Sequence, residues 1–180
     1  IHLPVQSGNT EILAKMNRGY TREWYLDRIA AIRRIYPECF ISSDFIAGFC
    51  GETEEQHQDT LSLIDEVQFS FSYMYTYSER PKTLAERKYE DDVPEEVKNR
   101  RLKEIIDKQR HYAMLSNKKH IGQIQRVLVE GVSKKSKEEL VGRNSYNTKV
   151  VFPKEQVQIG TYVDVKITNC TSATLLGELI

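Results

Sequence analysis

The chain has 180 residues, of which 39% are hydrophobic and 29% are charged, and its 26 basic side chains balance its 26 acidic ones. This composition supports folded domains with an apolar core, and three widely spaced cysteines exclude a disulfide framework or a metal-ligand cluster. No apolar run approaches the length of a membrane-spanning helix and no signal peptide opens the chain, so we expect a cytoplasmic protein without a membrane partner.

A short strand and two helices are predicted at the start of the chain. Residues 1–5 have the pattern of the tail of a strand, and because no methionine precedes them we expect the chain to be a fragment. Helices are predicted at Thr10–Met16 and from Thr21 to just before Pro37, since Thr21 can cap a helix and Pro37 ends one. The buried face of the second helix is predicted to carry Trp24, Leu26, Ile29, Ile32 and Ile35.

A strand, a glycine turn and a third helix follow. Cys39–Ala47 is rich in β-branched and aromatic residues, which is typical of a parallel strand covered on both faces. A carboxylate is costly to bury unpaired, so we expect Asp44 to point into a polar interior. Gly48 allows a sharp turn and a close approach of a ligand to the backbone, while Thr53 and Gln56 predict a capping box. Taken alone, this stretch fits a purely structural turn better than a ligand site.

Aromatic and small side chains alternate strictly from Phe69 to Tyr77. We expect the aromatic residues of this strand to pack outwards against helices, and Ser70, Ser72, Met74 and Thr76 to face the interior of a barrel. Strands that alternate with helices predict successive right-handed βαβ units. Three parallel strands cannot close a barrel, so we expect the missing strands to precede Ile1.

The sequence pattern changes from helical to β-rich at about residue 118. A charged helix predicted from Pro94 to Asn117 leads into short β-rich segments separated by Gly, Ser, Lys and Asn. Strands are predicted at residues 124–132, 140–143, 150–152, 162–168 and 175–179. Their number and spacing favour a small antiparallel barrel of the oligonucleotide-binding kind. The fold class is therefore α/β, a partial parallel (β/α) barrel at residues 1–117 followed by a small antiparallel β-barrel at residues 118–180.

Basic and aromatic residues gather in the predicted loops of the second domain. Residues 119–180 carry nine Lys and Arg against six Asp and Glu, whereas residues 1–118 carry 17 against 20. Basic side chains can neutralise phosphates, and tyrosine and amide groups can stack on or hydrogen-bond to bases. Lysines that only solubilise the surface explain the pattern as well. The candidate RNA-binding residues are Lys134, Lys135, Arg143, Tyr146, Asn147 and Lys149.

Separated motifs along the whole chain resemble one enzyme family. These motifs are HLPVQSG, MNRGYTREWYL, DFIAGFCGETEE, YTYSERPKT, DDVPEEVKNRRL, GRNSYN, VVFP and VKITNCTSATLLGE. The chain resembles the methylthiotransferase family of radical S-adenosylmethionine enzymes, most closely its MiaB group. The resemblance implies the second half of a radical (β/α) barrel followed by a TRAM domain that binds RNA. It also implies an enzyme that adds a methylthio group to C2 of N6-isopentenyladenosine at position 37 of tRNA.

The resemblance implies cofactors that this chain does not hold alone. In the family, S-adenosylmethionine works with two [4Fe–4S] clusters, one of them on a Cys-x3-Cys-x2-Cys loop. No such triplet occurs here, so we expect no metal ligands in this chain and no catalysis by the chain alone. The implied partners of the full-length protein are the anticodon stem-loop of tRNA and an electron donor that reduces the clusters.

The resemblance also assigns residues at the rim of the predicted parallel strands, although no catalytic residue is assigned. The implied cofactor-binding residues are Gln6, Ser7, Arg18, Asp44 and Gly48. Arg18 is placed to bind the cofactor's carboxylate, although a surface cation at a helix end explains it equally well. The residues implied to face the cofactor or the target nucleoside are Tyr77, Ser78 and Arg80.

Two residues depart from the family pattern, and two other functions stay open. Cys50 stands where the family usually has proline, and Lys82 where it usually has glycine. A sister methylthiotransferase, acting on threonylcarbamoyladenosine in tRNA or on an aspartate of a ribosomal protein, shares the barrel. A non-catalytic RNA-binding module also fits the chain as it stands. By resemblance alone, MNRGYT, DDVPEEVK and GRNSYN favour the isopentenyladenosine branch.

Overall fold

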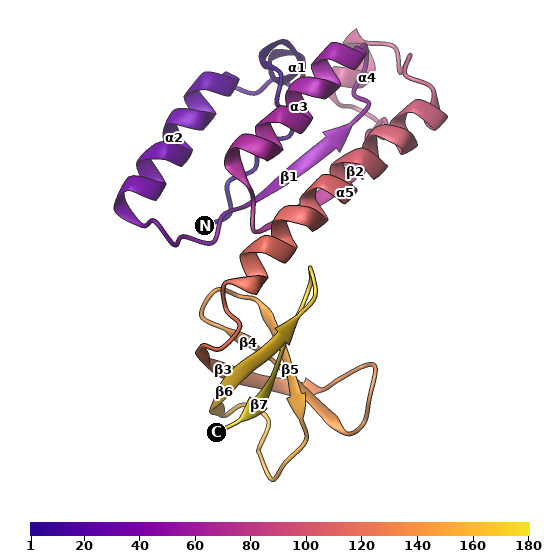
Figure 1. The fold of residues 1–180 in the computed structure, drawn as a ribbon. Coiled ribbons are helices and arrows are strands. Elements are labelled where there is room, and N and C mark those ends of the chain that lie inside the picture. Colours follow the sequence, from indigo (N-terminus) through magenta and orange to yellow (C-terminus); the bar gives the residue numbers. More distant parts are fainter. The chain divides into compact units, whose positions relative to one another are not determined.

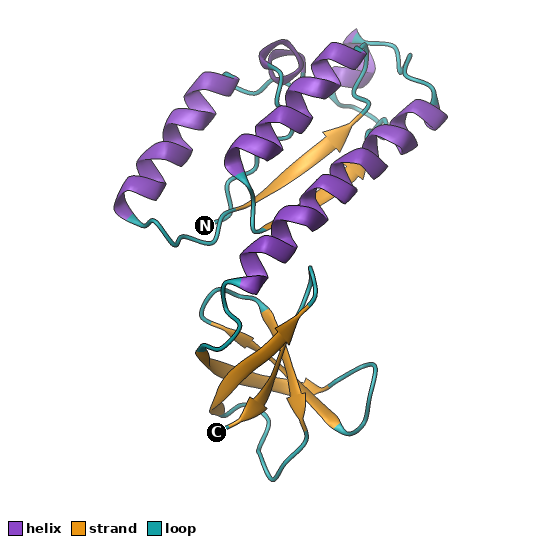
Figure 2. Cartoon of the chain, in the orientation of Figure 1, coloured by secondary structure: helices purple, strands orange, loops and turns teal.

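The computed structural model describes residues 1–180, which divide into two compact units, Ile1–Gln109 and Arg110–Ile180. The first unit combines helices with a small sheet, and the second consists mainly of strands (Figures 1 and 2). The chain contains no helix that is both long and apolar enough to span a bilayer. The mixed α/β class predicted from the sequence is confirmed.

The sheet of the first unit contains two parallel strands, β1 (Ser42–Ala47) and β2 (Phe71–Thr76). The start of the chain runs beside β1 through isolated parallel bridges at His2 and Gln6, where a third strand was predicted. Short, widely separated bridges replace a continuous ladder there. The helices are α1 (Thr10–Lys15), α2 (Arg22–Ile35), α3 (Glu54–Val67), α4 (Leu84–Lys88) and α5 (Glu95–Lys118), the last of which spans the division between the units.

Local side chains set where the helices of the first unit begin. Asn9 Oδ1 accepts hydrogen bonds from the first backbone N–H groups of α1, and Thr21 caps α2 as predicted. The predicted capping box of α3 is confirmed, because Thr53 and Gln56 each bond the other's backbone N–H. The Thr83 side chain accepts from the Glu86 N–H and caps α4, a helix that the sequence did not reveal.

Strand β2 turns its aromatic side chains the opposite way from the prediction. Its small residues face the helices, and Ser72 Oγ donates a 3.1 Å hydrogen bond to Gln109 on α5. Gln109 in turn donates to the Phe69 carbonyl at 2.7 Å, so the helix approaches the strand through hydrogen bonds that a bulky side chain would prevent. The outward, helix-packed placement was therefore wrong for three residues that are 41–58% exposed: Phe71, Tyr73 and Tyr75.

Strand β1 buries only one of its faces, so the predicted burial on both faces was also wrong. Phe45 and its alternate neighbours are buried, whereas Asp44 and Ile46 are half-buried. The parallel register sets Asp44 beside Tyr73 and Ile46 beside Tyr75. These four side chains lie on what we call the open face of the sheet, opposite the helices.

The buried face of α2 is also rotated relative to the prediction. Tyr25 and Ile29 are its buried residues, and the Tyr25 hydroxyl donates a 2.7 Å hydrogen bond to the Leu3 carbonyl. Trp24 and Ile35, predicted to be in the core, are instead 47% and 65% exposed. A tyrosine that satisfies its hydroxyl inside the core displaces the tryptophan next to it in sequence from that core.

A buried ion pair holds the glycine turn that follows β1. The side chains of Glu52 and Arg101 are 1% and 5% exposed, and their charged atoms lie 3.0 Å apart. The same Glu52 oxygen accepts a 2.8 Å hydrogen bond from the Gly48 backbone N–H. Burial raises the pKa of Glu52, while the Gly48 N–H and the Arg101 charge oppose this rise. The turn, α3 and α5 therefore share one electrostatic contact.

The second unit is a closed barrel with strand order β3-β4-β5-β7-β6. The five predicted strands are confirmed as β3 (Ile124–Val132), β4 (Glu139–Asn144), β5 (Lys149–Pro153), β6 (Tyr162–Cys170) and β7 (Leu175–Leu179). The barrel is not wholly antiparallel, because β5 and β7 pair in parallel. Gly142 explains one tight contact of the wall, since a Cβ there would lie 2.2 Å from the Leu128 carbonyl oxygen. The barrel interior is filled by apolar residues such as Val127, Phe152 and Ile167.

We expect Glu52→Gln to lower the free energy of unfolding of the first unit by about 3 kcal/mol, because it leaves the buried Arg101 charge unpaired. Urea denaturation followed by circular dichroism measures this change. Removing both charges in Glu52→Gln/Arg101→Met is expected to recover part of the loss, and Glu38→Gln on the surface is the control. A loss below about 1 kcal/mol for Glu52→Gln would show that the pair does not hold the turn.

Candidate functional site

A cavity of about 390 Å³ lies at the carboxyl ends of the two parallel strands. Ile46 from β1 and Tyr75 from β2 bring the open face of the sheet into its wall. In open α/β sheets, ligands bind at the carboxyl ends of the strands, in the crevice that the following loops leave open. The volume falls within the usual range of small-molecule sites.

Six of the eight residues predicted to contact the cofactor or the nucleoside line this cavity. They are Gln6, Arg18, Asp44, Tyr77, Ser78 and Arg80. Ser7 is fully buried instead, with its hydroxyl 3.3 Å from that of Thr60, and it accepts a hydrogen bond from the Asn9 N–H. Gly48 is not among the lining residues and forms the turn directly after β1. The structure thus gathers most of the set in one place, and the role of each residue toward a ligand stays a prediction.

The backbone of Gln6 is held in an uncommon conformation. Its φ of +77° lies in the left-handed region, which non-glycine residues rarely adopt. Two hydrogen bonds to β1 hold it there, because the Gln6 N–H donates to the Asp44 carbonyl and the Gln6 carbonyl accepts from Ile46, each at 2.9 Å. Strained residues of this kind gather at functional sites, which makes Gln6 a strong candidate within the cavity wall.

Two buried oxygen atoms of the cavity residues have no hydrogen-bond partner. One is Oδ1 of Asp44, which lies 3.4 Å from the His2 ring nitrogen. The other is the hydroxyl of Tyr77, whose pKa is raised by burial. Buried polar atoms are nearly always paired; the Cys50 thiol lies beside the Tyr77 hydroxyl, whereas Asp44 Oδ1 stays available to a donor from a polar ligand.

Packing from behind fixes the Tyr77 ring. The Phe49 ring meets it edge to face with centroids 4.9 Å apart, and the Lys98 ammonium lies 5.6 Å from its centroid. Lys98 is buried and donates hydrogen bonds to Asp91 and Glu95 at 2.7 and 2.9 Å. A Cβ on Gly48 would lie 2.4 Å from Lys98 Cγ, so only glycine leaves room for this lysine stem.

The two departures from the family pattern occupy different settings. Lys82 has a φ of +69°, a conformation that glycine adopts without strain, which explains why glycine suits this position. Its N–H donates a 2.8 Å hydrogen bond to Glu86, which holds the loop in place. Cys50 is buried beside Phe49 and Tyr77, and burial raises the pKa of its thiol. A neutral thiol therefore fills the space in the core.

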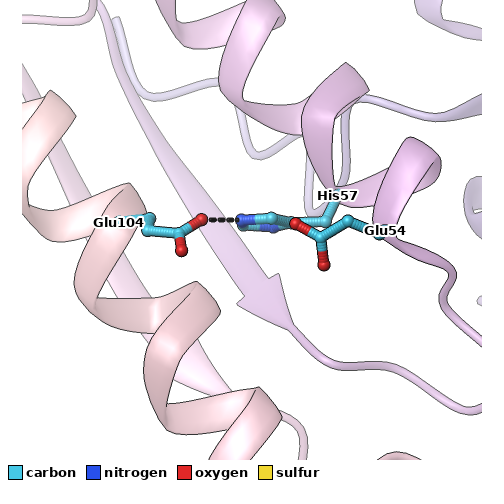
Figure 3. Close-up of side chains that lie close together, drawn as sticks. All are labelled: Glu54, His57 and Glu104. Atoms are coloured by element: carbon cyan, nitrogen blue, oxygen red, sulfur yellow. Dashed lines mark hydrogen bonds and ion pairs between the residues drawn. The ribbon is translucent and has the colours of Figure 1, made fainter.

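Glu54, His57 and Glu104 form a second cluster of polar side chains, with potential ligand atoms within 4.8 Å of one another (Figure 3). His57 is fully buried and its Nε2 lies 2.8 Å from Glu104. Arg100 bonds both carboxylates, at 2.6 Å to Glu54 and 2.7 Å to Glu104. Because an arginine already neutralises each carboxylate, these contacts suit an ionic link between α3 and α5 better than a cation site.

The turn between β4 and β5 contains two of the predicted RNA-binding residues, Tyr146 and Asn147, and is internally braced. Asn144 is buried, and its Oδ1 accepts hydrogen bonds from the Tyr146 and Thr148 N–H groups at 3.1 and 2.9 Å. Arg143 donates to the Asn147 carbonyl at 2.9 Å. The Tyr146 ring lies 5.2 Å from that of His120, a neighbour that the sequence did not reveal. Three further predicted residues have exposed side chains: Lys134, Lys135 and Lys149.

Comparisons with known proteins match both units. Residues 1–64 match the Radical SAM superfamily and residues 118–180 match the TRAM domain. The tRNA-2-methylthio-N(6)-dimethylallyladenosine synthase of Amoebophilus asiaticus is 63% identical over 180 residues, which cover 99% of this chain and 37% of that protein. The enzyme of the same name from Flavobacterium johnsoniae is 57% identical and covers 100% of this chain and 37% of its own length. The chain thus spans little more than a third of these relatives.

A solved structure shows the same fold. The coproporphyrinogen III oxidase (HemN) of Escherichia coli, a radical SAM enzyme, superposes with a TM-score of 0.53 at 17% identity. The match covers 92% of this chain and 40% of that protein. At this low identity the likeness concerns the fold alone.

The Glu54 carboxylate predicts a change of stability in acid. Hydrogen bonds from Arg100 lower its pKa from the usual 4.5 to about 2. A lowered pKa in the folded state means that the stabilisation is complete above about pH 4.5 and is lost as the pH falls toward 2. We expect Glu54→Gln to lower the melting temperature by about 2 °C at pH 7 and by less at pH 3.5.

Thermal melts at pH 7, 5 and 3.5 followed by circular dichroism measure this difference. Glu38→Gln, an exposed carboxylate outside the cluster, is the control. An equal loss for Glu54→Gln at every pH would contradict the proposed link between Glu54 and Arg100.

Proposed function

Because the chain belongs to the methylthiotransferase family of radical S-adenosylmethionine enzymes, we propose that it is part of a tRNA methylthiotransferase. The proposed reaction adds a methylthio group to C2 of N6-isopentenyladenosine at position 37 of tRNA. The observation that carries this proposal is the identity of 53–63% to enzymes of one name over nearly all of the chain. The other candidates named above, a sister enzyme or a non-catalytic module, have no comparable support.

The residues of the cavity fit the amino-acid part of S-adenosylmethionine. Arg18 offers a charge-assisted hydrogen bond to its carboxylate, and Asp44 Oδ1 offers the acceptor that its ammonium needs. Gln6 adds a neutral amide at the same wall. When bound at a reduced iron–sulfur cluster, the cofactor supplies the radical chemistry, and these side chains hold and orient it.

The cavity does not fit an iron–sulfur cluster, because no cysteine is among its lining residues. We propose that the full-length protein holds two [4Fe–4S] clusters whose ligands lie outside this chain, and that an electron donor reduces them. Ser7 and Gly48 then act behind the ligand, by shaping the turns that carry Gln6 and Asp44. The domains we propose are residues 1–117 for the radical barrel and 118–180 for the TRAM domain, in a cytoplasmic enzyme.

The partner we propose is the anticodon stem-loop of tRNA. Tyr77, Ser78 and Arg80 stand at the end of β2 and line the cavity, where the target adenosine enters. In the second unit, Lys134, Lys135 and Lys149 supply cations for phosphates. Tyr146 and Asn147 in the braced turn supply an aromatic ring and an amide for bases, and Arg143 at the end of β4 holds that turn.

Mass spectrometry of tRNA nucleosides tests the reaction. The full-length protein is incubated without oxygen with isopentenylated tRNA, reductant and S-adenosylmethionine, and we expect a 2-methylthio product. Cleavage of the cofactor without this product, with intact clusters, would assign the protein to a sister enzyme with another target. A protein that cleaves no cofactor but binds tRNA would be a non-catalytic module.

In the same full-length protein, we expect Arg18→Ala to raise the KM for S-adenosylmethionine at least tenfold, because a charged hydrogen bond to the carboxylate contributes about 1.5–3 kcal/mol. Arg87→Ala on α4 is the control, since Arg87 is exposed and does not line the cavity. An unchanged KM in Arg18→Ala would show that Arg18 does not bind the cofactor and is only a surface cation at a helix end.

The double variant Lys134→Glu/Lys135→Glu tests the second unit. We expect it to weaken tRNA binding at least tenfold and to reduce the dependence of affinity on salt, because two phosphate contacts are lost. Filter binding at two salt concentrations measures both effects. Glu138→Lys, in the same loop, is the matched control with a charge change of the opposite sign, and it is expected to keep or improve affinity.

A further inference from the structure

The single tryptophan of the chain, Trp24, lies on the surface of α2 and not in the core. The Tyr20 ring stacks on it with centroids 5.4 Å apart and an interplanar angle of 27°. The Arg28 guanidinium lies over the same ring, 5.5 Å from its centroid. Trp24 and Arg28 are four apart on α2, the spacing that places side chains on one face of a helix, and Tyr20 lies just before the N-cap Thr21. We call them the Tyr20–Trp24–Arg28 stack.

Internal contacts hold this stack in place. The Tyr20 hydroxyl donates a hydrogen bond to the Pro4 carbonyl at 3.0 Å, which anchors the base of the stack to the start of the chain. The backbone N–H of Trp24 donates to the Thr21 hydroxyl at 3.2 Å, which fixes the helix start that carries the ring. A large aromatic surface that is already ordered loses little conformational freedom when a partner binds to it.

Charge segregation around the stack points to a polyanion. Residues 15–36 carry six Lys and Arg and only two Asp and Glu, whereas the rest of residues 1–109 carries nine against eighteen. Within the stack, Arg28 pairs with Asp27, its neighbour in sequence. Arg33 is used internally, since it donates to the Val67 carbonyl. Even so, α2 and the turn before it form a basic segment in an otherwise acidic unit.

The stack follows closely in sequence on a residue of the cavity wall. Arg18 lines the cavity and precedes Tyr20 by two residues. The segment that carries the stack therefore also supplies one residue of the cavity wall.

We propose that the Tyr20–Trp24–Arg28 stack binds unpaired nucleotides of the tRNA that flank the nucleoside in the cavity. The proposal rests on the function proposed above, that the protein binds tRNA. Arg28 exchanges its exposed partner Asp27 for a phosphate, and the exposed part of the Trp24 ring contacts a base or ribose. The stack supplies this contact from the first unit, independently of the loops of the second.

The test measures tRNA binding by the 180-residue chain through Trp24 fluorescence and by filter binding. We expect saturating isopentenylated tRNA to protect Trp24 from quenching by acrylamide. We expect Arg28→Gln and Trp24→Ala each to weaken binding about tenfold, and Arg28→Gln to lower the slope of log K against log salt by about 1. Trp24→Phe, which keeps an aromatic ring, is expected to bind within about threefold of the parent chain.

Lys103→Gln is the matched control. Lys103 is an exposed helix cation that pairs with a nearby acid, Asp107, as Arg28 does with Asp27, but it lies on α5 and outside the basic segment. Far-ultraviolet circular dichroism confirms that each variant is folded. We expect the control to bind within about twofold of the parent chain.

The outcomes separate this inference from the function on which it rests. If tRNA binds while Trp24 stays open to acrylamide and Arg28→Gln binds as tightly as Lys103→Gln, the stack is not an RNA contact and the proposed function stands. If the folded chain and the full-length protein both fail to bind tRNA even at low salt, the proposed partner is wrong, and the inference is wrong with it.

Discussion

The buried contact between Glu52 and Arg101 is the constraint on which the first unit depends. It joins the start of α3 to α5, and through the Gly48 N–H it also fixes the turn that ends β1. Two charges removed from water are stable only when each finds partners, so the three segments cannot separate without exposing an unpaired charge. The Glu54, His57 and Glu104 cluster continues the same connection one turn along the helices (Figure 3).

This connection determines which face of the sheet is open. With α3 and α5 held on one side, the small residues of β2 lie under α5 and its tyrosines face away from the helices. Asp44 and Tyr77 then line a cavity at the carboxyl ends of the strands, and Asp44 Oδ1 has no hydrogen-bond partner there. The packing of the helices on one face therefore decides which side chains remain on the other face to form the site.

Polar contacts fix the ligand-facing parts of both units more than apolar packing does. In the first unit, Gln6 keeps a strained backbone through two hydrogen bonds to β1. In the second, Asn144 braces a turn through two backbone N–H groups while the barrel interior itself is apolar. Such turns present side chains in one arrangement, which is what the recognition of a shaped nucleic acid requires.

The sequence by itself determined the order and type of most elements, the helix caps at Thr21 and Thr53, the five strands of the barrel and the family, because these depend on local pattern and on motif identity.

Only the tertiary structure decided which face of each element is buried. Alternation in β2 specifies two faces without saying which one a helix covers, and Gln109, forty residues away from Phe69, decided it. Helical spacing likewise fits either Trp24 or Tyr25 in the core, and the Leu3 carbonyl, which pairs with the Tyr25 hydroxyl, made the choice. Side-chain direction depends on such partners distant in sequence, which no local pattern records.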